Sequence, residues 1–209
     1  MNVMRFIIAA VLFSAAAGIF PQSKPDALAE YRSGNYERTV QICREEIEEN
    51  SANLDSYVVM CWGLLRLRRY EETLRYARAA RNLSRYDSRV VEILGEVFYF
   101  QGNNAEALQY FQEYVNLAPT GQRIDNVYYF IGEIYIRMGK FRHADIALST
   151  AVHWLPGNAS WWTRLAFARE NAGDLTQAVA AYEKAISLNP QLTDARRGLD
   201  RLRQKLENR

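Results

Sequence analysis

The chain has 209 residues, and its formal net charge of +2 arises from 26 Lys and Arg against 24 Asp and Glu. A balance so close to zero gives no overall field that would favour nucleic acid, which we exclude as a partner. The length suffices for one domain with a continuous core, and no linker rich in glycine and serine indicates a second domain.

The first 18 residues have the composition of a secretory signal peptide. Arg5 precedes an apolar run, Phe6–Phe13, and the small residues of Ala15–Ala17 follow it. We expect cleavage near residue 18 and export to a periplasm or cell envelope, or secretion as the alternative. The other interpretation is an uncleaved membrane anchor, but the run Phe6–Phe20 has 15 residues, fewer than the ~20 of a spanning helix. We expect contact with a membrane only in that second case.

Beyond this segment, apolar residues at helical spacing, separated by turn residues, predict a chain built entirely of helices. Pro25 suits an early position of a short first helix, Pro25–Ser33. We expect ten further helices, at Tyr36–Glu49, Leu54–Leu67, Tyr70–Leu83, Ser88–Phe100, Asn104–Leu117, Asp125–Met138, Phe141–Leu155, Ala159–Asn171, Leu175–Leu188 and Thr193–Glu207.

The clearest internal pattern lies in the two helices expected at Ala159–Asn171 and Leu175–Leu188. Gly173 ends the first of the two and Pro190 follows the second, and Asp174 is expected to cap the second helix, with Gln177 three residues later. Two apolar stripes run along them, Trp162, Leu165 and Ala166 on the first and Ala178, Tyr182 and Ala185 on the second.

The same pattern recurs along the chain at a nearly constant distance. Gly139 lies 34 residues before Gly173, and Gly102 lies 37 residues before Gly139. The three additional residues fall in Thr120–Arg123, where a loop can accommodate them at little cost. Weaker copies at steps of 34 have their turns at Arg68-Arg69-Tyr70 and Gly34-Asn35-Tyr36.

This pattern resembles the tetratricopeptide repeat, a helix–turn–helix unit of 34 residues. Arg169 stands where the family pattern has its first aromatic residue. The resemblance covers nearly all of the chain beyond the signal and implies an all-α, right-handed superhelical solenoid of about five repeats. The expected repeats are residues 24–53, 54–87, 88–121, 125–158 and 159–192, with a C-terminal capping helix in 193–209.

The capping helix needs one face that docks on the last repeat, while its other faces are exposed to solvent. Its basic residues are interpreted as part of these solvent-exposed faces. Its expected docking stripe is Ala195, Leu199, Leu202 and Leu206.

The resemblance also implies that the protein acts by binding a protein or peptide partner in its concave groove. The positions expected to face that groove are Trp62, Arg66, Glu92, Glu96, Tyr99, Tyr129, Glu133, Arg137 and Phe167. Relatives that clamp the C-terminal carboxylate of chaperone tails use asparagine at one groove position of the repeat. At this position the successive repeats of this chain have Trp62, Glu96, Glu133 and Phe167. That clamp is therefore not expected here.

Two hypotheses follow for the acidic groove positions Glu96 and Glu133. With Tyr99 and Tyr129 beside them, they would favour a segment that carries Lys or Arg among apolar neighbours. Alternatively, these two carboxylates pair within the protein, with Arg66 and Arg137.

A stripe of arginines is expected on the opposite, convex face, at Arg75, Arg78, Arg81 and Arg85. Guanidinium groups bind phosphates and carboxylates, so the stripe could hold a large partner and make the protein an envelope-assembly scaffold. The competing interpretation is a solvated face, with Glu71 and Glu72 as partial partners.

We expect no enzyme activity, no metal and no cofactor, because no catalytic or phosphate-binding motif is present. His143 and His153 are ten residues apart, which places them about 80° apart around a helix. The alternative from a different functional class is an accessory subunit of an enzyme.

The two cysteines, Cys43 and Cys61, fall on neighbouring antiparallel helices at equal distance from the turn near Ala52. An exported protein meets oxidants, so a disulfide between them is one expectation. The other is two free thiols that pack as small buried residues.

Overall fold

The computed structural model describes residues 25–208, so the predicted signal peptide lies outside the described residues. This part of the chain contains eleven α-helices and no strand. The helices are α1 (Ala27–Arg32), α2 (Tyr36–Glu49), α3 (Leu54–Arg66), α4 (Tyr70–Leu83), α5 (Ser88–Phe100), α6 (Asn104–Leu117), α7 (Ile124–Arg137), α8 (Phe141–Trp154), α9 (Ala159–Ala172), α10 (Leu175–Leu188) and α11 (Thr193–Glu207). None of these helices combines the length and the apolar character that crossing a membrane requires.

The turn inside each helix pair has the same backbone conformation. Gly34, Gly102, Gly139 and Gly173 have φ values of +83°, +81°, +69° and +93°, and Arg68 occupies the equivalent place with φ +58°. These five positions are those of the predicted repeat register. Glycine adopts this left-handed conformation without strain, whereas an arginine does so at a cost.

One predicted helix start and one predicted capping interaction are wrong. Pro25 lies outside α1, because Asp26 is the N-cap and its carboxylate accepts from the backbone N–H groups of Leu28 and Ala29, at 2.9 and 3.1 Å. Asp174 is the N-cap of α10, but its side chain makes no capping hydrogen bond. Its ψ of 64° is far from the extended backbone that directs a capping side chain back onto the helix.

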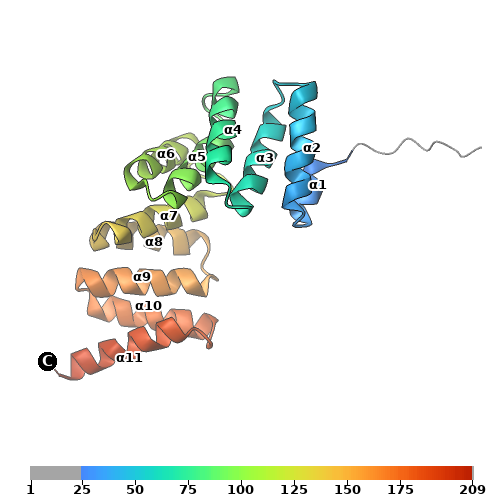
Figure 1. Ribbon diagram of the computed structural model, residues 1–209. Coiled ribbons are helices and arrows are strands. Elements are labelled where there is room, and N and C mark those ends of the chain that lie inside the picture. Colours follow the sequence, from blue (N-terminus) through green and yellow to red (C-terminus); the bar gives the residue numbers. More distant parts are fainter. Residues whose placement is uncertain (1–24, 209) are drawn as a thin grey trace, which may run out of the picture.

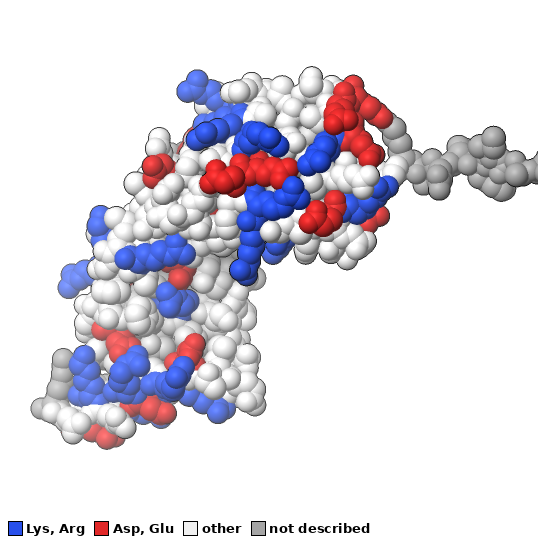
Figure 2. Space-filling view, in the orientation of Figure 1, with Lys and Arg blue, Asp and Glu red and all other residues white. Residues whose placement is uncertain are grey.

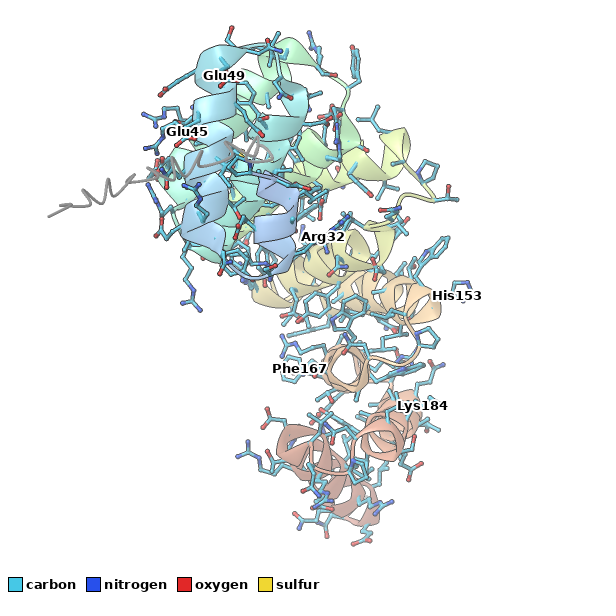
Figure 3. All side chains as sticks on the ribbon, turned by 90° about the vertical axis from the view of Figure 1, so that its right-hand side faces the viewer. Arg32, Glu45, Glu49, His153, Phe167 and Lys184 are labelled. Atoms are coloured by element: carbon cyan, nitrogen blue, oxygen red, sulfur yellow. The ribbon has the colours of Figure 1, made fainter. Side chains whose placement is uncertain are left out.

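The helices stack into an arc, with the N-terminal helices at one end and α11 at the other (Figure 1). The backbones of successive odd-numbered helices approach closely, from α1 against α3 to α9 against α11. The described even-numbered helices have no such close approach and are linked by long side chains, such as Arg81 of α4 and Glu113 of α6. The odd-numbered helices therefore line the inner, concave side of the arc. Figure 3 agrees, since Phe167 of α9 lies on one side of the stack while His153 of α8 and Lys184 of α10 lie on the other.

Close helix contacts hold each pair together. Gly95 of α5 faces the ring of Phe111 of α6, and Gly132 of α7 faces Leu148 of α8, each so closely that a Cβ would overlap the partner. Phe111 and Leu148 are completely buried. Side chains of this size supply most of the core, and the small residues opposite give them room.

The capping helix α11 docks through only part of the predicted stripe. Ala195, Leu199 and Leu202 are buried against α10, and Gly198 lies directly on the ring of Tyr182. Leu206 was predicted to belong to this stripe, but its side chain is 41% exposed. No further helix follows among the described residues to cover the last turn.

Candidate binding surface on the concave side

All nine predicted groove residues lie on odd-numbered helices, α3, α5, α7 and α9. A hollow of about 390 Å³ opens on this side, and it contains three of the nine, Trp62, Arg66 and Glu96. The other residues that line it come from α1, α3, α5, α7 and the loop before α7: Tyr31, Leu65, Phe100, Arg123, Asn126 and Phe130. The hollow therefore joins the first four odd-numbered helices.

Three of the predicted groove residues are buried and cannot offer a ligand their full side chains. Glu92 is 3% exposed, and Tyr99 and Glu133 are 8% and 9% exposed. They face the next odd-numbered helix instead of the solvent, because the inner helices pack closely along the arc.

Arg123 bridges two carboxyl groups. Its Nε donates to Glu92 at 2.7 Å and its Nη2 donates to Glu96 at 2.9 Å. Arg123 precedes α7, at the end of the three-residue insertion, so the inserted loop ties α7 to α5. Burial raises the pKa of Glu92 and the nearby Glu96 raises it further, while Arg123 opposes both effects.

Arg164 of α9 neutralises the remaining acidic groove residue. Its Nε and Nη2 donate to the two carboxylate oxygens of Glu133 at 2.6 and 2.9 Å, a bidentate pair. Beside this pair the ring of Tyr129 stacks on Trp161, with centroids 4.9 Å apart. Burial, with a smaller effect of Glu133, raises the pKa of Tyr129 to about 12.

Glu96 and Glu133 are therefore paired within the protein, but not with the arginines that the sequence suggested. Arg123 and Arg164 are their partners, in place of Arg66 and Arg137. The structure favours internal pairing over attraction of a basic ligand, because each of these carboxylates already accepts a hydrogen bond from an arginine of the protein.

Arg66 and Arg137 have no acidic partner among residues 25–208. Arg66 donates from Nε to the hydroxyl of Tyr31 at 3.3 Å. Arg137 donates to the carbonyl of Tyr99 at 3.0 Å, and its guanidinium carbon lies 3.8 Å from the centroid of the Tyr99 ring. Within residues 25–208, no carboxylate oxygen lies within 4 Å of either guanidinium.

Aromatic rings lie between these two cations. Phe100 is 44% exposed in the hollow, stacks on Tyr70 at 5.4 Å and contacts Phe130 at 6.1 Å. The sequence analysis did not select Phe100, although it occupies the same repeat position as Arg66 and Arg137. The repeat register could have identified it, whereas Arg123 belongs to the insertion and has no counterpart in other repeats.

The convex side carries a second hollow, of about 450 Å³, between α6, α7 and α8. Its apolar lining includes Val115, Tyr128, Ile131, Tyr135 and Ile146. The side chain of Ile146 is 69% exposed, the highest value among the large apolar residues of the described chain.

The predicted arginine stripe on α4 is not a row of equivalent free cations. Arg81 pairs with Glu113 at 2.6 Å, while Arg75 lies 3.9 Å from Glu72 and remains largely exposed. Figure 2 shows basic side chains over α3 and α4 with acidic side chains beside them. This mixture fits the solvated-face interpretation of the stripe.

No group of three or more His, Cys, Asp or Glu in residues 25–208 could hold a metal ion. His143 packs against Tyr135, with ring centroids 5.2 Å apart. Cys43 and Cys61 are both completely buried free thiols, and the Sγ of Cys61 donates to the carbonyl of Thr73 at 3.8 Å.

The fold is similar to those of several solved tetratricopeptide-repeat proteins. PilF of Pseudomonas aeruginosa aligns with a TM-score of 0.76 and 18% identity, over 87% of this chain and 81% of that one. YrrB, described as a TPR protein with an unusual peptide-binding site, aligns with a TM-score of 0.71 and 18% identity, over 80% and 84%. MamA of Desulfovibrio magneticus RS-1 aligns with a TM-score of 0.67 and 20% identity, over 74% and 85%.

A search of curated protein sequences gives no match. Residues 30–195 match the family described as the C-terminal domain of cilia and flagella-associated protein 70, a tetratricopeptide-repeat domain. This match spans most of the chain. It includes the turn inside each of the five helix pairs, from Gly34 to Gly173. The chain therefore belongs to this family of tetratricopeptide-repeat proteins.

Proposed function

We propose that this protein is a non-enzymatic module that binds an extended segment of a partner protein on its concave side. The observation that carries the proposal is the hollow formed jointly by α1, α3, α5 and α7, which Trp62, Phe100 and Phe130 line. Partly exposed aromatic rings beside arginine are the side chains that most often anchor a protein interface.

The shape of the site favours an extended ligand. The lining residues come from successive inner helices, so the hollow runs across the helices and along the inside of the arc. A ligand lying in this direction contacts a new helix every ~10 Å, about three residues of extended chain. An extended segment therefore reaches several repeats with only a few residues.

We also propose that the module acts after export, because residues 1–18 have the composition of a secretory signal. N-terminal sequencing of the protein isolated from its host tests this. A new N-terminus near residue 18 is expected, and an intact Met1 in the membrane fraction would favour the anchored form.

The apolar hollow on the convex side favours a second candidate function, that of an assembly scaffold. Ile146 exposes most of its side chain there, next to Tyr128 and Tyr135. An exposed apolar surface of this kind is typical of a protein contact.

One cross-linking experiment separates the two functions. A photoreactive phenylalanine is placed at Phe100 in the concave hollow, at Ile146 in the convex hollow, or at Lys184 on the outer face of α10 as a control. Concave binding predicts that a discrete partner is cross-linked from position 100 and not from 146 or 184. A partner captured from position 146 alone would replace the proposed groove function with the scaffold.

A further inference from the structure

The charges of the concave surface do not cancel. Its three buried or half-buried carboxyl groups, Glu92, Glu96 and Glu133, pair with two arginines, Arg123 and Arg164. Arg66 and Arg137 add two positive charges that no carboxylate of the described chain contacts within 4 Å. Four arginines against three glutamates leave an excess of one positive formal charge among these groove residues, although the whole chain is nearly neutral.

The two uncompensated arginines occupy equivalent places on the arc. Arg66, Phe100 and Arg137 lie at the C-terminal ends of α3, α5 and α7, with spacings of 34 and 37 residues. Because these helices contact one another in sequence, the inner wall carries a cation, an aromatic ring and a second cation on successive helices.

The protein holds both guanidinium groups in place and leaves part of each free to bind. Arg66 uses Nε on Tyr31, which leaves its two terminal nitrogens, and Arg137 uses Nη1 on Tyr99, which leaves Nη2 and Nε. A carboxylate accepts hydrogen bonds from such a pair of nitrogens, and the fixed side chains lose little entropy when they bind one.

We infer that the ligand of this groove is an acidic extended segment, with carboxylate side chains on Arg66 and Arg137 and an apolar side chain between them on Phe100. This inference rests on the proposed function and adds the chemistry of the partner. Helix spacings of ~10 Å place the two arginines about 20 Å apart, which corresponds to about six residues of extended chain.

A basic segment fits this surface less well. Its Lys or Arg side chains would approach Arg66 and Arg137, and Glu96 and Glu133 could receive them only by leaving Arg123 and Arg164. Giving up a partly buried pair costs more than an exposed contact returns.

Four synthetic peptides of about nine residues test the inference with the full chain beyond the signal. The first has two glutamates at each end, a central leucine and serines between, and both termini are blocked. In the second every glutamate is glutamine, and in the third every glutamate is lysine. A fourth peptide, the glutamine version with a free C-terminal carboxylate, distinguishes internal acidic side chains from recognition of a chain end.

Affinities are measured by fluorescence anisotropy for the parent protein and four variants. Arg66→Gln and Arg137→Gln are each expected to weaken binding of the acidic peptide about tenfold. Arg142→Gln removes the same charge from the exposed face of α8 and is expected to leave the affinity unchanged. Phe100→Ala is expected to weaken binding of every peptide that uses the hollow, and unchanged melting temperatures confirm that the variants fold.

The inference is overturned if the acidic peptide fails to bind, if the lysine or glutamine peptide binds as tightly, or if only the free C-terminus matters. Equal binding of all peptides with dependence on Phe100 would reject the acidic ligand and keep the groove. Binding of the acidic peptide that is insensitive to Phe100, Arg66 and Arg137 would reject the proposed groove function as well.

Discussion

Individual small residues set how closely the helices of one repeat approach. A Cβ added at Gly95 would lie 2.6 Å from Cε1 of Phe111, whose ring is completely buried and has no free space into which to move. We expect Gly95→Ala to destabilise the protein by ~1–3 kcal/mol, because the overlap forces the ring or the helix to shift. Urea denaturation measures the change.

Gly157 provides the matched control. It lies in a loop, and an added Cβ would meet no atom within 4 Å. Gly157→Ala should therefore change the free energy of unfolding by less than about 0.5 kcal/mol. Equal losses for the two variants would mean that the Gly95 contact does not limit packing.

The cysteines give a second prediction at the same scale. Burial, with a smaller effect of Glu46, raises the pKa of Cys43 to about 12, and burial also raises the pKa of Cys61. Both groups are therefore protonated thiols at neutral pH and react slowly. Native protein should resist alkylation, and unfolded, unreduced protein should gain an alkyl group on each of Cys43 and Cys61 in mass spectrometry.

The disulfide that the sequence allowed gives the opposite readout. Unfolded protein purified from the exported compartment would then gain no alkyl group until it is reduced. The experiment thus decides between the two expectations, since only a bridge protects both sulfurs in the unfolded chain.

Ion-pair partners were the least predictable property of single residues. The sequence identified Glu96 and Glu133 as inner-wall residues, and both lie there. Their partners could not be predicted, because Arg123 belongs to the insertion and Arg164 stands where the preceding repeat has Phe130. A repeat pattern predicts on which face of the solenoid a side chain lies. It does not predict the contacts of residues that depart from the pattern.

Helix boundaries, in contrast, were predictable to within one residue everywhere except at α1. Each pair contains a turn that requires a left-handed residue, and glycine marks this turn in four of five cases. Capping was less predictable because it depends on ψ. Asn158 and Asp174 are both N-caps, but only Asn158, with ψ 96°, accepts hydrogen bonds from its helix.

The exception among the turns, Arg68, gives a prediction at the scale of the element. Its φ of +58° strains a residue that carries a Cβ, whereas a glycine adopts it freely. We expect Arg68→Gly to stabilise the protein by about 0.5–1 kcal/mol, partly offset by the greater freedom of glycine in the unfolded chain. Gly102→Ala, at the equivalent turn, should have the opposite sign, and thermal denaturation compares the two.

The docking of α11 gives a further prediction. Leu202 is completely buried against the last repeat, while Leu206, one turn later, is 41% exposed. Leu202→Ala should therefore destabilise the protein by ~2–4 kcal/mol, and Leu206→Ala by less than ~1 kcal/mol. If both changes cost the same in urea denaturation, the helix does not dock as the structure shows.

At the scale of the whole molecule, each helix contacts only its near neighbours along the arc. Stability in such a chain is a sum of repeat and interface contributions, so the ends can open without the middle. The N-terminal end is stabilised by the least burial, because α1 has six residues and only Ala27 among them is buried. In the middle, nine of the thirteen residues of α5 are buried.

Hydrogen exchange should therefore show a gradient along the chain. We expect the amides of α1 and of the last turn of α11 to exchange first, and those of α5 to exchange last, close to the rate set by global unfolding. The Leu202→Ala variant should accelerate exchange in α11 and α10 while leaving α5 slow, because the lost contact lies at the far end of the arc. Uniform exchange in all helices, with a uniform response to that substitution, would instead indicate a single cooperative unit. A local response matters for the groove, since Tyr31 of α1 holds Arg66, and opening of α1 would release one of the two cations that we propose to bind the ligand.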